Sequence, residues 1–365
     1  MKVAVIGGGL AGIVCALQLE RLGIIPDLFE RNSDLAESYR HVGAALEIVL
    51  RPIKDPLQYM SQNYGICIKP SGLVKKIVHK SPSACTTITG SLGYFLHRGS
   101  MPGSIENQLA KGLNSRLFFN TEADFMELKR AYDHVVVATG FPFEARRSGI
   151  WRDIIKMGIK GAVVSGDFST DTFTVWLNKD FCRSGYAYLA PFNDKEATLA
   201  LAVDGIDLDE IDGYWEHFIR AEKIIYKMKE CFKRMHYSGF VQPHRVDNVY
   251  FIGNAGGALD PLLGFGVFPS VVTASEAAKC IACGADYEAR IRDVVKLNMK
   301  LLEFRKTFDM LGNKGYDLLF RLIGLPGANA LIYRSGINAV TLGYSALKPF
   351  NALMGRGKKL SRDLP

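Results

Sequence analysis

Short apolar runs and one helical repeat alternate over the first thirty residues of the chain. Residues 2–6 form an apolar run typical of a parallel strand that is buried on both faces. Residues 11–22 then carry apolar side chains at mostly helical spacing, and Gly23 is a natural end for that helix. A second short strand is predicted over residues 27–30. The pattern therefore predicts a strand–helix–strand unit within residues 1 to about 45.

The pattern changes further along the chain. A four-residue apolar strand is predicted at residues 135–138, and alternating apolar and polar positions predict strands of a second sheet at residues 172–177 and 197–203. Residues 208–236 are predicted to be helical. Near residue 250 the buried-strand pattern returns, followed by a glycine-rich loop and a helix of small residues, so the first domain is predicted to be discontinuous. Beyond residue 286 the chain is predicted to be helical and is unusually apolar.

Three glycines join the first strand to the first helix at the G-x-G-x-x-G spacing. Gly7 permits the tight turn, Gly9 lets the backbone approach a pyrophosphate, and Gly12 lets the helix pack close to the strand. The positive end of the helix then faces phosphate oxygens. Glu30, at the end of the second strand, is placed to accept hydrogen bonds from an adenosine ribose. These residues predict an adenine dinucleotide, without separating NAD from FAD.

Composition and charge describe an ordinary globular protein. Its 365 residues are enough for two domains that each have a hydrophobic core. Of these residues, 48% are hydrophobic and 22% are charged. The net charge of +8 comes from scattered basic residues, so nucleic-acid binding is not expected; an anionic cofactor or an anionic lipid surface fits better. Seven cysteines, without framework spacing, indicate a reducing compartment. Cys280 and Cys283 are expected to pack in a helix, and no metal site is predicted.

The termini carry no targeting or membrane-spanning pattern in this interpretation. The N-terminal strand belongs to the dinucleotide motif, so it is not expected to be a removable signal peptide. The apolar C-terminal region is divided by Arg321, Arg334 and Lys348 into runs too short to span a bilayer. We therefore expect a cytoplasmic protein and leave peripheral membrane association open.

Later motifs favour FAD by resemblance. The set GGGLAG…FER, Arg98 before a helix, VVVATG and FIGNAGGALDPLLGFGV resembles the glutathione-reductase-type FAD proteins of the aromatic hydroxylase group. Within that group, the Asp260-Pro261-Leu262 loop and the segment SGYAYLAPFNDKEATLALAV most resemble the geranylgeranyl reductase family. The stretch HVGAALEIVLRPI is more similar to FAD monooxygenases.

The resemblance implies an α/β fold with three parts. A discontinuous Rossmann-like FAD-binding domain is expected at residues 1–65, 90–160 and 243–285. A second, mainly antiparallel β-sheet substrate domain is expected at residues 66–89 and 161–242, and a helical C-terminal region at residues 286–365.

The resemblance also implies site residues. Arg98 is expected at the ribityl-phosphate region of FAD, and Gly253 and Asn254 at the ribityl chain and pyrophosphate, with Asn254 in place of the usual Asp. The helix opening near Gly264 is expected to face the flavin N1/O2 edge and to favour its reduction. The expected cofactor-binding residues are Gly7, Gly9, Leu10, Ala11, Gly12, Glu30, Arg31, Arg98, Thr139, Gly140, Gly253, Asn254, Asp260, Gly264, Gly266 and Val267. The expected substrate-binding residues are Tyr186, Tyr188 and Pro191.

The implied function is that of an FAD-dependent oxidoreductase acting on a small hydrophobic substrate, with isoprenoids and lipids as the expected classes. We expect reduction of a carbon–carbon double bond by hydride from flavin N5. An FAD-dependent monooxygenase using NAD(P)H and oxygen, and a low-turnover flavin-binding redox protein, remain alternatives. Flavin halogenases share this fold and carry a Trp-x-Trp-x-Ile-Pro element. The tryptophans here, at 151, 176 and 215, form no such pair, so halogenation is disfavoured. The sequence identifies no catalytic acid or base, and His41, His97 and His244 are interpreted as structural.

Two further features are left open at this stage. The electron donor is NAD(P)H or a reduced electron carrier, and a nicotinamide is expected to bind transiently because a second dinucleotide motif is absent. The apolar C-terminal helices serve either a greasy substrate or membrane face, or a buried subdomain or dimer contact.

Overall fold

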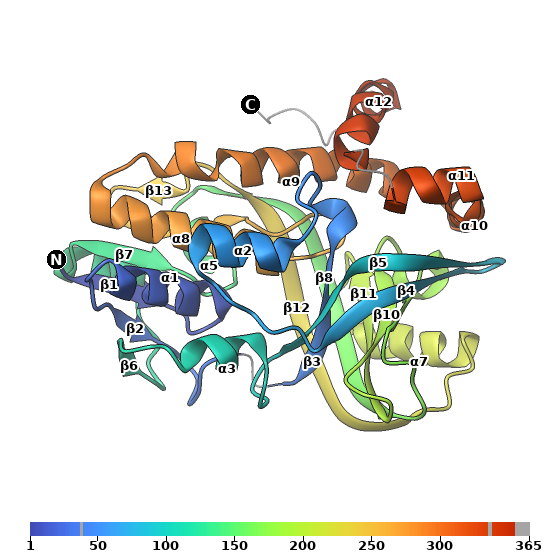
Figure 1. Ribbon diagram of the computed structural model, residues 1–365, viewed down its shortest axis with the longest axis horizontal. Coiled ribbons are helices and arrows are strands. Elements are labelled where there is room, and N and C mark those ends of the chain that lie inside the picture. The colour runs from blue at the N-terminus through green and yellow to red at the C-terminus, as the bar shows by residue number, and fades with distance from the viewer. Residues whose placement is uncertain (37–38, 335–337, 355–365) are drawn as a thin grey trace.

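The computed structural model describes residues 1–36, 39–334 and 338–354, which form two sheets with helices packed around them (Figure 1). Sheet A is parallel except for its last pair, β13 and β14. Its strands, in spatial order, are β13 (Arg245–Val246), β14 (Val249–Phe251), β7 (His134–Val137), β1 (Val3–Ile6), β2 (Asp27–Phe29) and β6 (Arg116–Phe118).

Both faces of sheet A are covered, which explains the uninterrupted apolar runs of its central strands. In β1, Val3 and Val5 pack in the core formed with α1 (Leu10–Arg21) and α8 (Val267–Cys283), whereas Ala4 and Ile6 point to the opposite core. The first core also includes residues of α2 (Pro56–Tyr64) and α3 (Ile105–Ala110). The second core includes Phe125 and residues of α4 (Phe125–Ala131) and α5 (Phe143–Arg147).

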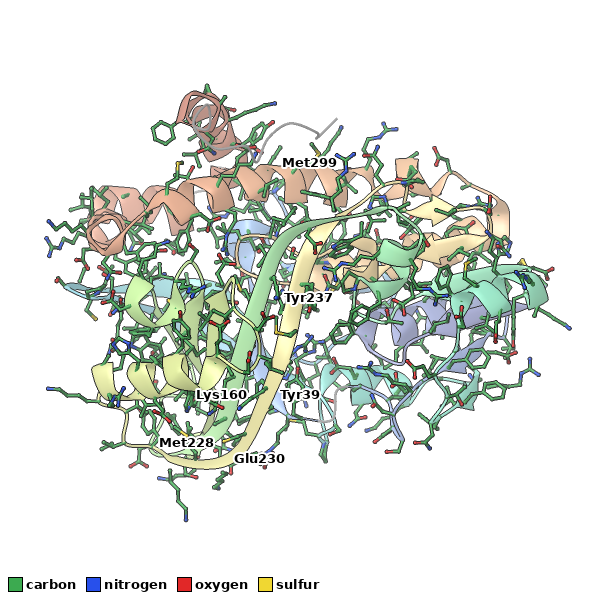
Figure 2. The ribbon with its side chains drawn as sticks, turned by 180° about the vertical axis from the view of Figure 1, so that it is seen from behind. Tyr39, Lys160, Met228, Glu230, Tyr237 and Met299 are labelled. Atoms are coloured by element: carbon green, nitrogen blue, oxygen red, sulfur yellow. The ribbon has the colours of Figure 1, made fainter. Side chains whose placement is uncertain are left out.

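Sheet B is antiparallel except for one parallel pair, β4 with β9. Its order is β12 (Lys227–Val241), β8 (Trp151–Ser165), β11 (Glu196–Asp204), β10 (Tyr186–Pro191), β9 (Thr172–Trp176), β4 (Gly72–Ser81), β5 (Ala84–Arg98) and β3 (His41–Leu46). The long neighbours β8 and β12 run the height of the molecule, with Tyr237 and Glu230 marking β12 (Figure 2). They connect the part of the chain that forms sheet A with the part that forms sheet B.

The two faces of sheet B have different surroundings. In β11, Leu199 and Leu201 pack against the apolar stripe of α7 (Ile211–Ala221), which includes Trp215 and Phe218. The alternate residues Ala200 and Ala202 point to the opposite face. This period of two leaves one face of the sheet free to line a site. The short helix α6 (Lys179–Cys182) also packs on the α7 side.

Beyond Asp286 the described residues are largely helical, as predicted. The long helix α9 (Tyr287–Met310) lies across the top of the molecule, and α10 (Asn313–Gly324), α11 (Pro326–Asn329) and α12 (Ala339–Met354) follow it (Figure 1). Short turns complete the described elements: η1 (Glu47–Val49), η2 (Gly253–Gly256) and a π-helical turn at Ala330–Arg334. No helix among the described residues is both long and apolar enough to cross a membrane.

The predicted fold class is confirmed, but one predicted element is wrong. Residues 208–236 are not a single helix: α7 ends at Ala221, and β12 begins at Lys227. Lys, Met and Glu are good helix formers, so the local sequence of residues 227–236 favoured a helix, and pairing along the whole of β8 overrides that preference.

The strands also cross the predicted domain boundaries. Residues 41–46, 90–98 and 151–160, which the prediction assigned to the FAD-binding domain, pair in sheet B as β3 and as parts of β5 and β8. Strands β5 and β8 therefore belong to one sheet throughout their length, and the predicted boundaries near residues 90 and 160 fall inside them.

Candidate functional site

A cavity of about 500 Å³ lies between the two sheets and beside the first turns of α1 and α8. All but three of the nineteen predicted site residues line it, the exceptions being Gly12, Gly253 and Pro191. A second cavity of about 520 Å³ adjoins it on the outer side of the β7 loop. The two cavities share Gly7, Glu30, Arg31, Thr139 and Phe141 as lining residues. Segments far apart in the sequence thus converge on one elongated space.

The glycine turn after β1 leaves no room for side chains on its inner side. A Cβ on Gly12 would lie 1.9 Å from the carbonyl oxygen of Gly7, and Gly7 itself has φ of +105°. By contrast, a Cβ on Gly9 would meet no atom within 4 Å. Gly12 therefore permits close packing of α1 on the strand, while Gly9 presents bare backbone next to the cavity.

Glu30 lies where the two cavities meet and is 6% exposed. One carboxylate oxygen accepts a hydrogen bond from the backbone N–H of Gly8 at 2.7 Å, and the other accepts from Asn32 at 2.8 Å. Next to it, the Arg31 guanidinium lies 5.3 Å from the ring centroid of Phe141. Glu30 thus orders the glycine turn as well as facing the cavity.

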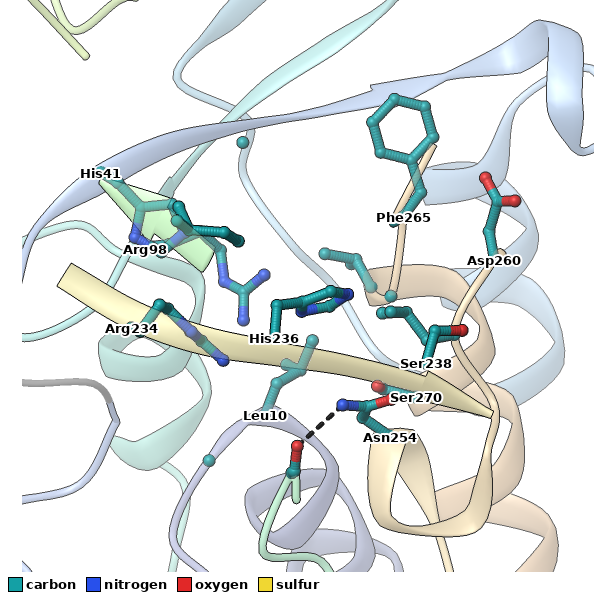
Figure 3. Close-up of a pocket in the computed structure, with 18 of the residues that line it drawn as sticks. Leu10, His41, Arg98, Arg234, His236, Ser238, Asn254, Asp260, Phe265 and Ser270 are labelled. Atoms are coloured by element: carbon teal, nitrogen blue, oxygen red, sulfur yellow. Dashed lines mark hydrogen bonds between the residues drawn. The ribbon is translucent and has the colours of Figure 1, made fainter. Parts of the chain in front are cut away.

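Arg98 reaches the cavity from the end of β5. Its Nε donates to Glu106 at 2.6 Å, and Glu106 is only 2% exposed, so this ion pair is largely removed from water. Figure 3 shows the Arg98 guanidinium directed into the cavity. On the β7 side, the Thr139 hydroxyl donates to Glu144 at 2.9 Å, which fixes the loop that carries Gly140.

The side-chain amide of Asn254 connects both sheets at the cavity. Its Nδ2 donates to the carbonyl oxygen of Gly140 at 2.8 Å and to that of Tyr237 on β12 at 3.0 Å (Figure 3 draws the first of these bonds). Its Oδ1 is buried and has no hydrogen-bond partner within the described part of the chain. The same holds for the hydroxyl of Ser238, a residue that is 1% exposed and lines the same cavity. Among the residues that the structure describes, these two buried polar atoms of the cavity therefore have no protein partner.

This geometry explains why asparagine replaces the usual aspartate at position 254. Two carbonyl oxygens point at one side-chain atom, and only an N–H donor satisfies them. The preceding residue, Gly253, has φ of +56°, and a Cβ there would lie 2.8 Å from the Cβ of Ala11. Gly253 therefore lets η2 approach α1 without itself lining the cavity.

The loop before α8 is held by Asp260. Its carboxylate accepts from the backbone N–H groups of Leu262 at 2.7 Å and Leu263 at 3.2 Å. Burial raises the pKa of Asp260 to about 6, although these N–H groups and Arg305 act to lower it. Gly264 has φ of +74°, a conformation that favours glycine.

The loop ends at the start of α8, whose first turn faces the cavity. Gly266 is the N-cap of α8, and the bond from Ser270 N–H to the Gly266 carbonyl is the first that closes a turn of this helix. The preceding N–H groups, of Val267 and Phe268, have no acceptor within the helix. Gly266 and Val267 both line the cavity, so the positive end of α8 lies beside it.

The three predicted substrate residues are divided by the structure. Tyr186 and Tyr188 line the cavity from β10, with ring centroids 6.3 Å apart. The Tyr186 hydroxyl donates to the carbonyl oxygen of Leu263 at 2.6 Å, and burial raises the pKa of Tyr186. Pro191 ends β10 and is buried away from the cavity lining.

Sequence reasoning missed a row of residues on β12. Figure 3 shows Arg234, His236 and Ser238 along one edge of the cavity, and Phe232 lies one step earlier on the same face. Tyr39 stacks on Phe232 with ring centroids 4.1 Å apart, beside β12 (Figure 2). The alternation Phe-x-Arg-x-His-x-Ser was visible in the sequence, but the helix prediction for this segment concealed it.

The floor of the cavity on β8 and β11 was also missed, and it is apolar. Ile155, Met157 and Ile159 face it from β8, and Ala200 and Ala202 face it from β11. The alanines leave the space that larger side chains would fill.

The histidines and tryptophans fall into clear groups. His41 lines the cavity, His97 lies against Phe192, and His244 binds Glu288 on α9 through Nδ1 at 2.8 Å. No tryptophan is among the cavity-lining residues. Cys280 is buried in α8 and Cys283 is exposed, and the described residues contain no cluster suited to a metal ion.

Comparison with known proteins agrees with this architecture. No family model matches the chain. Digeranylgeranylglycerophospholipid reductase 2 of Methanothermobacter thermautotrophicus is 23% identical over 363 residues, covering 87% of this chain and 90% of that protein. A geranylgeranyl bacteriochlorophyll reductase-like protein from Thermoplasma acidophilum superposes with a TM-score of 0.68 at 15% identity, covering 95% of this chain and 98% of the other. A flavin-dependent brominase superposes with a TM-score of 0.65 at 13% identity, covering 98% of this chain and 99% of the other. The chain therefore has the fold of the FAD-dependent oxidoreductases and resembles their geranylgeranyl reductase and aromatic hydroxylase group, as its motifs indicated.

Proposed function

We propose that the two joined cavities bind one FAD molecule. We assign the ribose to Glu30, which ends the second strand of the dinucleotide motif and lies where the cavities meet, and the adenine to the outer cavity beside Phe141. The bare backbone at Gly9 and the start of α1 then take the pyrophosphate. The residues present fit the cofactor: the unpartnered Oδ1 of Asn254 is an acceptor for ribityl hydroxyls.

The start of α8 suits the flavin ring. Its first N–H groups, which have no acceptor within the helix, and the positive helix end favour negative charge, and reduced flavin carries negative charge at its N1/O2 edge. Gly264 and Gly266 keep side chains out of this approach. The Asp260 carboxylate is turned into its own loop, so it stabilises the loop backbone and is not a ligand in this assignment.

The reaction that we propose is reduction of a carbon–carbon double bond in an isoprenoid or other lipid-like substrate. The single observation that carries this choice is the apolar floor of β8 and β11, which lies in the same cavity as the start of α8. FAD, when bound, supplies hydride transfer and receives its electrons from NAD(P)H or a reduced carrier. The chain itself orients the alkene on Ile155, Met157 and Ile159 and excludes water. The similarity to a reductase of geranylgeranyl lipids supports the same substrate class.

The deciding experiment is anaerobic. Reduced, FAD-loaded protein is mixed with a polyprenyl alcohol or a prenyl phosphate, and the product is analysed by mass spectrometry. We expect a mass gain of two hydrogens per reduced bond. Product that forms only with oxygen and carries one added oxygen atom would make the protein a hydroxylase. If protein that retains flavin forms no product either without or with oxygen, a low-turnover redox protein would be favoured.

A further inference from the structure

Helix α10 has apolar side chains on two opposite faces. Tyr316 and Phe320 point inward and are 0% and 3% exposed. Leu318 and Leu322 lie at helical spacing on the other side and are 58% and 47% exposed, and Leu325, the C-cap that follows the helix, is 53% exposed. One face of α10 therefore packs on the rest of the protein, and its other apolar face contacts nothing in the described part of the chain that buries it.

Helix α12 repeats this arrangement. Its inner side packs on α9, where Gly343 lies against the ring of Phe304 and the side chain of Asn351 is buried. On its outer side Leu342 is 59% exposed and Phe350 is 45% exposed. Both views of the molecule place α12 outside α9, at the edge of the fold (Figures 1 and 2). We call the outward residues Leu318, Leu322, Leu325, Leu342 and Phe350 the C-terminal apolar face.

Positive charge is concentrated in the same part of the chain. Residues 311–365 contain eight Lys and Arg against two Asp, so this segment carries six of the eight units of net positive charge. Lys314 is exposed on the outer side of α10, and Lys348 is exposed on α12. Arg321 is exposed at the edge of α10, where its Nη2 donates to the carbonyl oxygen of Ser83 at 3.2 Å. Long basic side chains between apolar ones are typical of helices that lie in the headgroup layer of an anionic bilayer.

The inner side of α10 packs against aromatic residues that line the main cavity. Ile323 packs in one cluster with Tyr188 and Phe265, and Phe320 packs in another with Tyr186. The exposed leucines of α10 are therefore separated from the aromatic end of the cavity by the thickness of one helix. A surface that touches lipid at this position would present a membrane-borne substrate to that end of the cavity.

We propose that the C-terminal apolar face docks on the surface of an anionic lipid bilayer. The leucines and Phe350 enter the acyl boundary, while Lys314, Arg321 and Lys348 remain at the phosphate level. This inference extends beyond the proposed reaction, since docking requires neither flavin nor turnover.

Vesicle flotation tests the proposal directly. Full-length, FAD-loaded protein is mixed with vesicles of phosphatidylcholine alone or with equal parts of phosphatidylglycerol, and the floated fraction is measured. We expect flotation with the anionic vesicles, weakened by high salt, and little with the neutral ones. The double variant Leu318→Glu/Leu322→Glu should reduce the floated fraction by about tenfold or more. Both positions are exposed, so folding and flavin content should not change.

The matched control is Ile225→Glu, which removes an apolar side chain that is 94% exposed between α7 and β12. It should float like the wild type. Wild-type protein that stays in solution with anionic vesicles, or a double variant that floats as well as the wild type, would overturn the proposal. A double variant that changes from dimer to monomer in light scattering, with no vesicle binding by the wild type, would identify this face as a contact between copies of the chain. Flotation without alkene reduction would support docking while contradicting the proposed reaction.

Discussion

The side-chain amide of Asn254 donates a hydrogen bond to the carbonyl oxygen of Gly140, 2.8 Å away, and a second bond to Tyr237 on β12. This single amide joins the loop after β7 to the long strand that crosses between the two sheets. Its Oδ1, which has no partner among the described residues, is the atom that we propose binds the cofactor. The position therefore combines a structural role with the proposed binding role, and the two can be separated by substitution.

Asn254→Asp should reduce both stability and flavin retention. A carboxylate would face two carbonyl oxygens, so we expect a loss of about 1–3 kcal/mol in the free energy of unfolding at pH 8. The new carboxyl group would be protonated more readily when folded than when unfolded, so the loss should shrink as the pH falls toward 5. Denaturant unfolding at both pH values and flavin absorbance after gel filtration measure the two effects.

Asn248→Asp is a matched control for this substitution. The Asn248 amide also donates to two carbonyl oxygens, those of Lys129 and Tyr132, but it does not line the cavity. It should lose stability and keep its flavin. Equal flavin loss in both variants would show that Asn254 acts on the cofactor only through the fold.

The parts of the site that were predictable from the sequence depend on local spacing. Gly7, Gly9 and Gly12 act within one turn, and Glu30 follows from the length of a single strand–helix–strand unit. The β12 row was not predictable in this way, because pairing with β8 decides both that residues 227–241 are a strand and which of its faces meets the cavity. Arg234 and His236 therefore became visible only once the tertiary pairing was known. The same reason applies to Ala200 and Ala202, whose small size has meaning only once the strand face that lines the cavity is known.

Glu30→Ala should weaken FAD retention by about 1–3 kcal/mol, the cost of leaving buried hydrogen-bonding groups without partners. The cofactor-free protein should also lose stability, because the N–H groups of Gly8 and Asn32 lose their acceptor. Flavin dissociation rates and melting of the cofactor-free protein measure the two effects. Glu30→Gln, which keeps one acceptor oxygen, should be intermediate. An unchanged dissociation rate in Glu30→Ala would show that the ribose is held elsewhere.

Tyr186→Phe removes the hydroxyl that binds the carbonyl oxygen of Leu263. We expect a stability loss of about 1 kcal/mol and a shift in the flavin absorbance spectrum, since the loop before α8 would lose its link to β10. Tyr214→Phe is the control, because the Tyr214 hydroxyl bonds Arg183 at an exposed position away from the cavity. An unaltered spectrum in Tyr186→Phe would mean that the loop is fixed without this bond.

Asp260 should make stability fall with rising pH between about 4 and 6. Burial raises its pKa from 3.8 to about 6, so the folded state holds a proton that the unfolded state has already released. A shift of this size corresponds to a loss on the order of 3 kcal/mol across that window, as the proton leaves the folded protein. Other carboxylates titrate in the same range, so the measurement is the difference between wild type and Asp260→Asn in denaturant unfolding at each pH. Parallel pH profiles for the two proteins would contradict the assignment.

Phe265 should limit the length of the prenyl substrate that the cavity accepts. Its side chain lines the main cavity (Figure 3). It also lines a smaller apolar space of about 30 Å³ bounded by Leu46, Leu50 and Leu301. Phe265→Ala would join these spaces, so the ratio of kcat/KM for a longer prenyl substrate to that for a shorter one should rise by about tenfold, the effect of about one methylene in an apolar pocket. Phe265→Leu retains part of the barrier and should give a smaller change. The same kcat/KM ratio in all three proteins would show that the prenyl chain of the substrate does not pass Phe265. The end of that prenyl chain would then lie along β8 and β11 alone.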